Sequence, residues 1–257
     1  HAAMQIAAGD YETNIKVEGP KEIVELAQTL NTMSECLVEH MSRLRESSVI
    51  RERMYGEYEC ALRLQHYMLQ KVIEEFQLPS LRIVLVSVPH SPLEKGLLLK
   101  AFTPAPSDFS LTLLEASEPG FAGLFHLNQW AHHPIEELPK IPYVHCHYVA
   151  ATHSLNWSTY ALFAPLVWSI RSQQFIKGIQ QNIPVQNGDM IFLYNSSMID
   201  HFTTENAIEA WFSRVLRHFA EDGLETIQTM LTNELTFLTK KQPVKHNYKI
   251  IGLQLTF

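Results

Sequence analysis

Histidine and cysteine side chains are the first candidates for chemistry in this chain. The 257 residues include 13 histidines, and His145, Cys146 and His147 follow one another in a segment with strand character. Because side chains alternate between the faces of a strand, His145 and His147 share one face, which suits one soft metal ion. No third ligand stands nearby at metal spacing, although His153 could lie close after a turn. We favour the simpler interpretation, in which these histidines lie on one face of a strand at the edge of a sheet and bind no metal ion.

Cysteine chemistry receives little support from the sequence. Cys36, Cys60 and Cys146 form an odd set without paired spacing. This suits buried thiols in a reducing cytoplasm rather than disulfides. No oxyanion motif flanks Cys146, so a Cys–His protease dyad is not favoured. The net charge of −7 without a Lys/Arg-rich run excludes a nucleic-acid footprint.

The first third of the chain is predicted to be helical. Its apolar residues recur at spacings of three and four, with charged residues between them: Ile23, Leu26, Leu30, Met33, Leu37, Met41 and Leu44. This near-heptad seam predicts a parallel dimeric coiled coil, and the alternative is an amphipathic helix packed on its own domain. A second helical stretch runs from Arg51 to Phe76, and Pro79 ends it.

Beyond Pro79 the pattern changes to short β-rich segments separated by turn signals. Strands are predicted at 81–88, 96–102, 111–114, 143–151, 158–163, 166–170, 190–194 and 249–255, and amphipathic helices at 207–219 and 224–238. This order predicts an α+β domain in which helices cover a sheet or a sheet sandwich.

The N-terminal segment resembles a HAMP linker. The resemblance rests on Gly9-Asp10-Tyr11, Glu22-Ile23, Leu26-Ala27 and Leu30-Asn31-Thr32-Met33, with Val24 at a position where that family often has glycine. It implies a parallel homodimer that relays a signal from a membrane span missing upstream. The chain is then the cytoplasmic portion of an inner-membrane-anchored protein, and His1-Ala2-Ala3 reads as a cloning remnant.

The following segments resemble RsbU-type phosphatases, which are type 2C serine/threonine phosphatases. The opening helix of that family is matched by Glu59, Ala61, Leu64, Gln65, Met68 and Leu69, and a later strand by Gly188–Tyr194. The resemblance implies an α-β-β-α sandwich. It divides the chain into a partial HAMP domain and coiled-coil linker (1–50), a switch helix (51–78) and a type 2C phosphatase-like domain (79–257).

The resemblance also implies where two catalytic Mg²⁺ or Mn²⁺ ions would bind, because the family places aspartates in four short motifs. Here the corresponding positions carry Asp108, Glu115, Ser196 and Asn247, and the cationic Lys249 follows. Hard divalent ions need several oxygen ligands, so losing carboxylates from three motifs predicts a pseudophosphatase without a cofactor. Its expected partner is an antagonist protein of a sigma-factor partner-switching pathway or a paralogous phosphatase.

Two alternatives stay open. In the first, Asp108, Glu115 and His246 hold one Mn²⁺ ion and support slow hydrolysis of a phosphorylated anti-sigma-factor antagonist. In the second, the chain is a ligand sensor in which the former metal site holds a small anion near Lys249.

Overall fold

A computed structural model describes residues 20–88, 95–131, 133–134, 137, 140–176, 182–241 and 247–256. The chain divides into two compact units, His1–Gly56 and Glu57–Phe257. One helix, α2 (Lys21–Glu75), contributes to both units. The residues Gly9-Asp10-Tyr11, on which part of the HAMP resemblance rests, lie outside the described residues, as does His246.

Helix α2 begins directly after Pro20 and ends four residues before Pro79, as the positions of the prolines predict. It continues through Ser47 and Ser48, where the apolar seam weakens, so the two predicted helical stretches are one helix. In the first unit the seam residue Leu37 is 42% exposed and Leu44 is 69% exposed.

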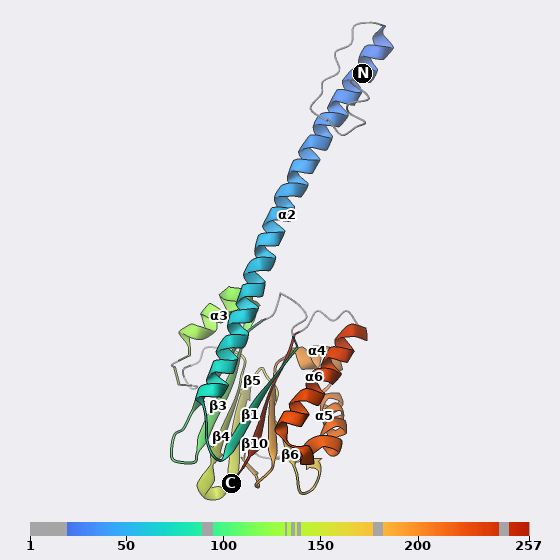
Figure 1. Cartoon of the computed structure of the whole chain (residues 1–257). Helices are drawn as coiled ribbons and strands as arrows, with labels where there is room; N and C mark the ends of the chain where they lie inside the picture. Colours follow the sequence, from blue (N-terminus) through green and yellow to red (C-terminus); the bar gives the residue numbers. More distant parts are fainter. Residues whose placement is uncertain are drawn as a thin grey trace. The chain divides into compact units, whose positions relative to one another are not determined.

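The second unit contains two antiparallel sheets of five strands each among the described residues (Figure 1). The first sheet has the order β1-β10-β9-β6-β7, formed by β1 (Leu81–Val88), β10 (Tyr248–Leu255), β9 (Met190–Tyr194), β6 (Leu166–Ser169) and β7 (Gln174–Phe175). The second has the order β2-β3-β4-β5-β8, formed by β2 (Lys95–Phe102), β3 (Phe109–Pro119), β4 (Tyr143–Val149), β5 (Ser154–Tyr160) and β8 (Asn182–Pro184).

Helices cover the outer faces of both sheets. Beyond α2, the helical elements are α3 (Gly120–Gln129), α4 (Ser197–Phe202), α5 (Glu205–Phe219), α6 (Leu224–Lys241) and the short 3-10 turns Ala150–Thr152 and Ala220–Asp222. Helices α5 and α6 bury an apolar face on the first sheet, whereas α3 packs on the second. The predicted α+β sandwich is therefore confirmed, with its layers in the order helix, sheet, sheet, helices (Figure 1).

The main hydrophobic core lies between the two sheets, and the last turns of α2 close one side of it. Leu69 and Ile73 of α2 are buried there together with inward-facing residues of both sheets, such as Leu97 of β2 and Leu253 of β10. The strands β1 and β2 are the edge strands of their sheets, and α2 reaches the edge of β2 at Leu97, whose N–H donates to Gln65.

Candidate functional site

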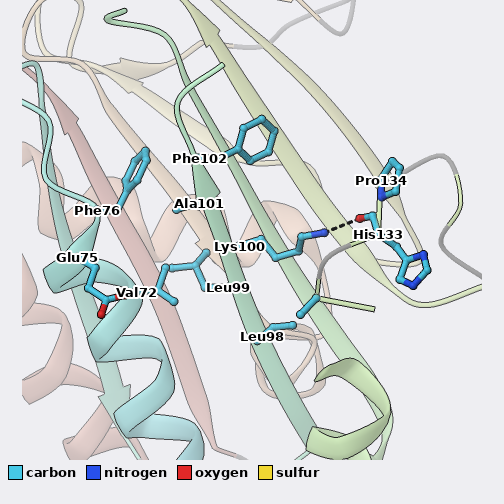
Figure 2. A pocket seen from close by; sticks show the side chains of 11 residues that line it. Val72, Glu75, Phe76, Leu98, Leu99, Lys100, Ala101, Phe102, His133 and Pro134 are labelled. Atoms are coloured by element: carbon cyan, nitrogen blue, oxygen red, sulfur yellow. Dashed lines mark hydrogen bonds between the residues drawn. The ribbon is translucent and has the colours of Figure 1, made fainter. Parts of the chain in front are cut away.

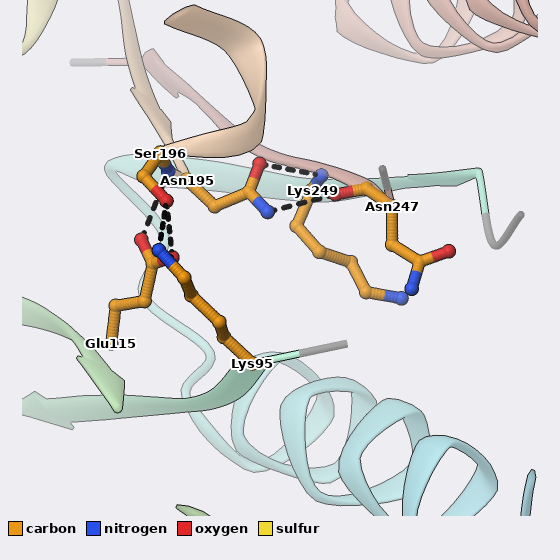
Figure 3. A network of polar contacts seen from close by, with 6 residues as sticks. All are labelled: Lys95, Glu115, Asn195, Ser196, Asn247 and Lys249. Carbon is orange, nitrogen blue, oxygen red and sulfur yellow. Dashed lines mark hydrogen bonds and ion pairs between the residues drawn. The ribbon is translucent and has the colours of Figure 1, made fainter. Parts of the chain in front are cut away.

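The centre of the candidate site is the carboxylate of Glu115, near the end of β3. This side chain is 2% exposed. Its Oε1 accepts a hydrogen bond of 2.5 Å from Ser196 Oγ, and its Oε2 accepts one of 2.9 Å from Ser196 N. The ammonium of Lys95 lies 3.5 Å from Glu115 Oε1 and donates to Ser196 Oγ over 3.1 Å (Figure 3). Both carboxylate oxygens therefore already have partners from the protein.

A second polar group lies beside Glu115, where β9 ends and β10 begins (Figure 3). Asn195 Nδ2 donates to the carbonyl oxygen of Asn247 over 2.8 Å, and Asn195 Oδ1 accepts from Lys249 N over 3.2 Å. The Lys249 side chain is buried, and its Nζ donates to Ser87 Oγ of β1 over 2.5 Å. These contacts are amide and ammonium contacts, not carboxylate contacts.

The structure brings together three of the four positions expected from the motifs. Glu115, Ser196 and Asn247 come from the ends of β3, β9 and β10, with Glu115 and Ser196 in direct contact. Asn247 joins them through Asn195, the residue before Ser196.

Asp108 does not lie with this group. It precedes β3, seven residues before Glu115, and seven residues of extended chain span about 23 Å. Its Oδ1 accepts a hydrogen bond of 2.8 Å from Ala150 N in the turn after β4. The assignment of Asp108 to the first metal motif is therefore wrong, and a single ion cannot be shared by Asp108 and Glu115. His246, the third ligand of that alternative, lies outside the described residues.

Lys95 is the site residue that sequence reasoning missed. The hairpin of β2 and β3 pairs Leu97 with Glu115 and Lys95 with Pro119, so the start of β2 lies directly beside the site. The sequence contains a signal for it, because counting back across the predicted hairpin from Glu115 leads to the start of β2. The motif resemblance points instead to the turn after β2, which carries Asp108.

The residues of the predicted switch helix divide between two faces of α2. Ala61, Gln65 and Leu69 repeat every four residues and are buried against the sandwich, whereas Leu64 is exposed. Met68 is half-buried against the α3 side of the second sheet, and Glu59 pairs with Arg63 at 2.7 Å on the exposed face.

Gln65 ties α2 to the strand next to the site. Its Oε1 accepts a hydrogen bond of 2.9 Å from Leu97 N, and Leu97 is the residue paired with Glu115. A shift of this part of α2 therefore acts on β2 two residues from Lys95.

A groove of about 670 Å³ lies further along the same edge of β2 (Figure 2). Its walls are the last turns of α2, with Val72, Glu75 and Phe76, and the segment around His133 and Pro134. Its floor is residues 98–102 of β2. Because Leu97 N points outward to α2, alternation along the strand also turns the backbone N–H groups of Leu99 and Ala101 outward.

The surroundings of His145, His147 and Cys146 indicate that these side chains stabilise the fold and form no reactive group. His145 Nδ1 lies 2.9 Å from Thr112 Oγ1, and His145 and His147 share one face of β4, as alternation predicts. Cys146 is completely buried in the core, and burial raises the pKa of its thiol far above the ordinary value. Among the described residues, no three side chains of histidine, cysteine, aspartate and glutamate are grouped so that they could hold a metal ion.

The second unit has the fold of the PP2C phosphatases. The SiaA-PP2C domain of Pseudomonas aeruginosa matches with a TM-score of 0.57 and 11% identity, over 82% of this chain and 98% of that chain. The RsbU and RsbW domains of Rv1364c from Mycobacterium tuberculosis match with a TM-score of 0.55 and 12% identity. That match covers 70% of this chain but only 61% of the other, so this chain spans less than two thirds of that relative.

The N-terminal segment, residues 1–39, matches the HAMP domain family. A HAMP domain therefore precedes the PP2C-like fold, as the sequence pattern predicts. No curated protein sequence matches the chain. In the part of the chain that the structure describes, each helix is too short or too polar to serve as a transmembrane span.

The fold family implies divalent metal ions, and the residues of this site do not fit them. Among the residues that the structure describes here, the carboxylate is that of Glu115, and it already contacts an ammonium group and two donors of Ser196. The neighbouring positions offer a hydroxyl, amides and the cation of Lys249, which repels a dication. Hard ions bind through several carboxylate or carbonyl oxygens, and this arrangement presents too few of them.

Proposed function

We propose that the chain is a pseudophosphatase, a PP2C-like domain that binds a signalling partner and does not hydrolyse phosphoserine. One observation carries this proposal: the ammonium of Lys95, together with Ser196, occupies the oxygens of Glu115. A metal ion would have to displace Lys95, and the described residues offer it no group of three histidine, cysteine, aspartate or glutamate side chains. The lysine thus supplies the positive charge that a metal supplies in an active member of this fold.

The proposed role is regulation in a membrane-linked partner-switching pathway that controls a sigma factor. The HAMP match at residues 1–39 supports an input from a membrane receptor, with this chain as its cytoplasmic part. The exposed seam of α2 supports a parallel homodimer, because a heptad seam gains stability by packing against a second copy. We assign residues 1–50 to the HAMP and linker region, 51–78 to the switch helix and 79–257 to the binding domain.

The groove beside β2 is the proposed contact surface for the partner, an antagonist protein of the pathway or a paralogous phosphatase. The occupant we propose is an extended segment of that protein, which adds as a strand to the edge of β2. The outward N–H groups of Leu99 and Ala101 supply main-chain donors, and Phe102, 50% exposed, supplies an apolar contact.

A titration of Mn²⁺ into the purified chain, followed by calorimetry, tests the loss of catalysis. A PP2C phosphatase with intact metal ligands serves as the positive control. We expect no saturable heat at millimolar Mn²⁺ and no release of phosphate from a phosphoserine protein. Saturable binding together with phosphate release that Glu115→Ala abolishes would refute the proposal.

A separate binding measurement with a purified anti-sigma-factor antagonist tests the partner. Phe102→Glu is expected to weaken binding, whereas Phe237→Glu, a change at an equally exposed phenylalanine of α6, is expected to leave it unchanged. Equal effects of both substitutions would refute the assignment to the groove.

A further inference from the structure

The floor of the groove beside β2 presents two different sides to a strand that adds to this edge. Because side chains alternate along a strand, Lys100 and Phe102 lie on one side of β2, and Leu99 and Ala101 lie on the other. The side of Leu99 and Ala101 faces the core between the sheets, where Leu99 is 2% exposed. An added strand therefore meets a polar and aromatic surface with every second side chain and the margin of the core with the others.

The register of an added antiparallel strand follows from the hydrogen bonds of β2. The N–H of Leu97 points away from β3 to Gln65, so those of Leu99 and Ala101 also point away from β3 and pair with the added strand. Lys100 then stands in a non-hydrogen-bonded pair, in which opposite Cα atoms lie about 4.5 Å apart and the side chains are closest. The partner residue opposite Lys100 therefore contacts the lysine side chain directly.

Lys100 brings a positive charge to the floor of the groove. Its Nζ donates a hydrogen bond of 2.6 Å to the carbonyl oxygen of His133, an acceptor without a net charge (Figure 2). Burial lowers the pKa of Lys100, which means that its surroundings stabilise the charged ammonium less than water does. Because an ammonium has three donors, it can keep the bond to His133 and also donate to a carboxylate. A carboxylate opposite Lys100 would offset part of the lost hydration.

Helix α2 supplies an apolar wall for the other side chains of the added strand. Val72 and Phe76 line the groove and pack against the core between the sheets. Glu75 also lines the groove, but its carboxylate lies 3.6 Å from Lys71, and the two side chains are 67% and 53% exposed. Its charge is therefore screened by its partner and by water. The residues before and after the one opposite Lys100 thus meet apolar surface.

We propose that the groove selects an extended partner segment in which one acidic residue lies between two apolar residues. The acidic side chain lies opposite Lys100, and the apolar side chains pack against Val72 and Phe76. This inference rests on the proposed function, in which β2 receives a strand of the partner, and it adds the residue that determines specificity. A basic residue at the acidic position is disfavoured, because like charges directly opposite one another destabilise a strand pair.

Fluorescence anisotropy with labelled, end-capped peptides and the full chain tests the inference. One peptide has a glutamate between two valines, and a second has glutamine in place of the glutamate and is otherwise identical. We expect the glutamate peptide to bind about tenfold more tightly, the equivalent of one charge-assisted hydrogen bond. This preference should disappear in Lys100→Met, which keeps the apolar part of the side chain. It should persist in the control Lys240→Met, because Lys240 is an exposed lysine of α6 that does not line the groove.

Charge reversal separates selection by Lys100 from a general loss of folding. Lys100→Glu should prefer a third peptide, with lysine between the two valines, over the glutamate peptide. Three results would overturn the inference: no binding of the glutamate peptide at millimolar concentration, equal binding of the glutamate and glutamine peptides, or a glutamate preference that Lys100→Met retains. The contact surface of the proposed function is tested separately, by the effect of Phe102→Glu on binding of the antagonist protein, so the two can fail independently.

Discussion

Replacing Lys95 by alanine removes the ammonium group that the proposal treats as the substitute for a metal ion. Glu115 would keep the two hydrogen bonds from Ser196 but would lose its only counter-charge among the described contacts. A buried carboxylate without a counter-charge is costly, and it gains most from a new cation. Lys95→Ala is therefore expected to destabilise the protein and to create affinity for Mn²⁺.

The size of the effect follows from the geometry. At 3.5 Å and an effective dielectric constant of about 20, the attraction of the pair is about 5 kcal/mol before solvation is counted. Lys95 is 48% exposed, so water screens much of this energy and the ammonium is easily solvated. We therefore expect the free energy of unfolding to fall by about 1–2 kcal/mol, and the Mn²⁺ affinity to rise about tenfold.

Thermal unfolding with and without Mn²⁺ measures both effects in one experiment. Lys100→Ala is the matched control, because Lys100 lies on the same strand and its Nζ donates to the carbonyl oxygen of His133 instead of to a carboxylate. Mn²⁺ should stabilise Lys95→Ala and leave the wild-type chain and Lys100→Ala unchanged. Equal stabilisation of all three proteins by Mn²⁺ would refute the reasoning.

Three further outcomes are expected. Gly120→Ala should lower the melting temperature, because the φ of Gly120 is 68°, in the left-handed region, and a Cβ there would lie 2.5 Å from a tyrosine ring of α2. Gly56→Ala is the control: Gly56 lies in open space within α2, so this substitution should raise the melting temperature slightly. If the proposed coiled-coil dimer forms, Leu37→Glu should dissociate it in sedimentation experiments, whereas Val38→Glu, off the seam but 40% exposed, should not. Folding lowers the pKa of His66, so as pH falls the unfolded state binds a proton at this histidine before the folded state does. The free energy of unfolding should therefore decrease as pH falls below about 6.5, and this decrease should be smaller in His66→Gln.

Much of the fold could be predicted because its elements have strong local signals. Strand β1, from Leu81 to Val88, is a continuous β-rich run, and α5 and α6 have clear apolar faces. Helix α3 was not predicted: it starts at Gly120 after a proline and has a weak amphipathic pattern. Its first residue needs a left-handed φ and the close approach of a tyrosine ring, which are tertiary conditions that no local pattern contains.

The site was predictable only as far as motifs could be aligned to strand ends. Glu115 and Ser196 lie at or near the end of a recognisable strand and Asn247 directly before one, and the structure brings the three together. Asp108 does not lie with them, because a lone acidic residue in a turn matches a motif by residue type without sharing its position in the fold. The turn actually uses its carboxylate to bind Ala150 N, a local role that any well-placed acceptor could fill.

The ion pair between Lys95 and Glu115 and the contact between α2 and the sandwich are linked through strand β2. Lys95 and Leu97 belong to the same short stretch of β2; the first neutralises Glu115 and the second donates its N–H to Gln65 of α2. In an active member of the fold, a metal ion would tie these strand ends together only when it is bound. Under the proposed function, the ion pair between Lys95 and Glu115 takes the place of that metal ion. We then expect the contact between Gln65 of α2 and Leu97 of β2 to be the part that responds to a signal.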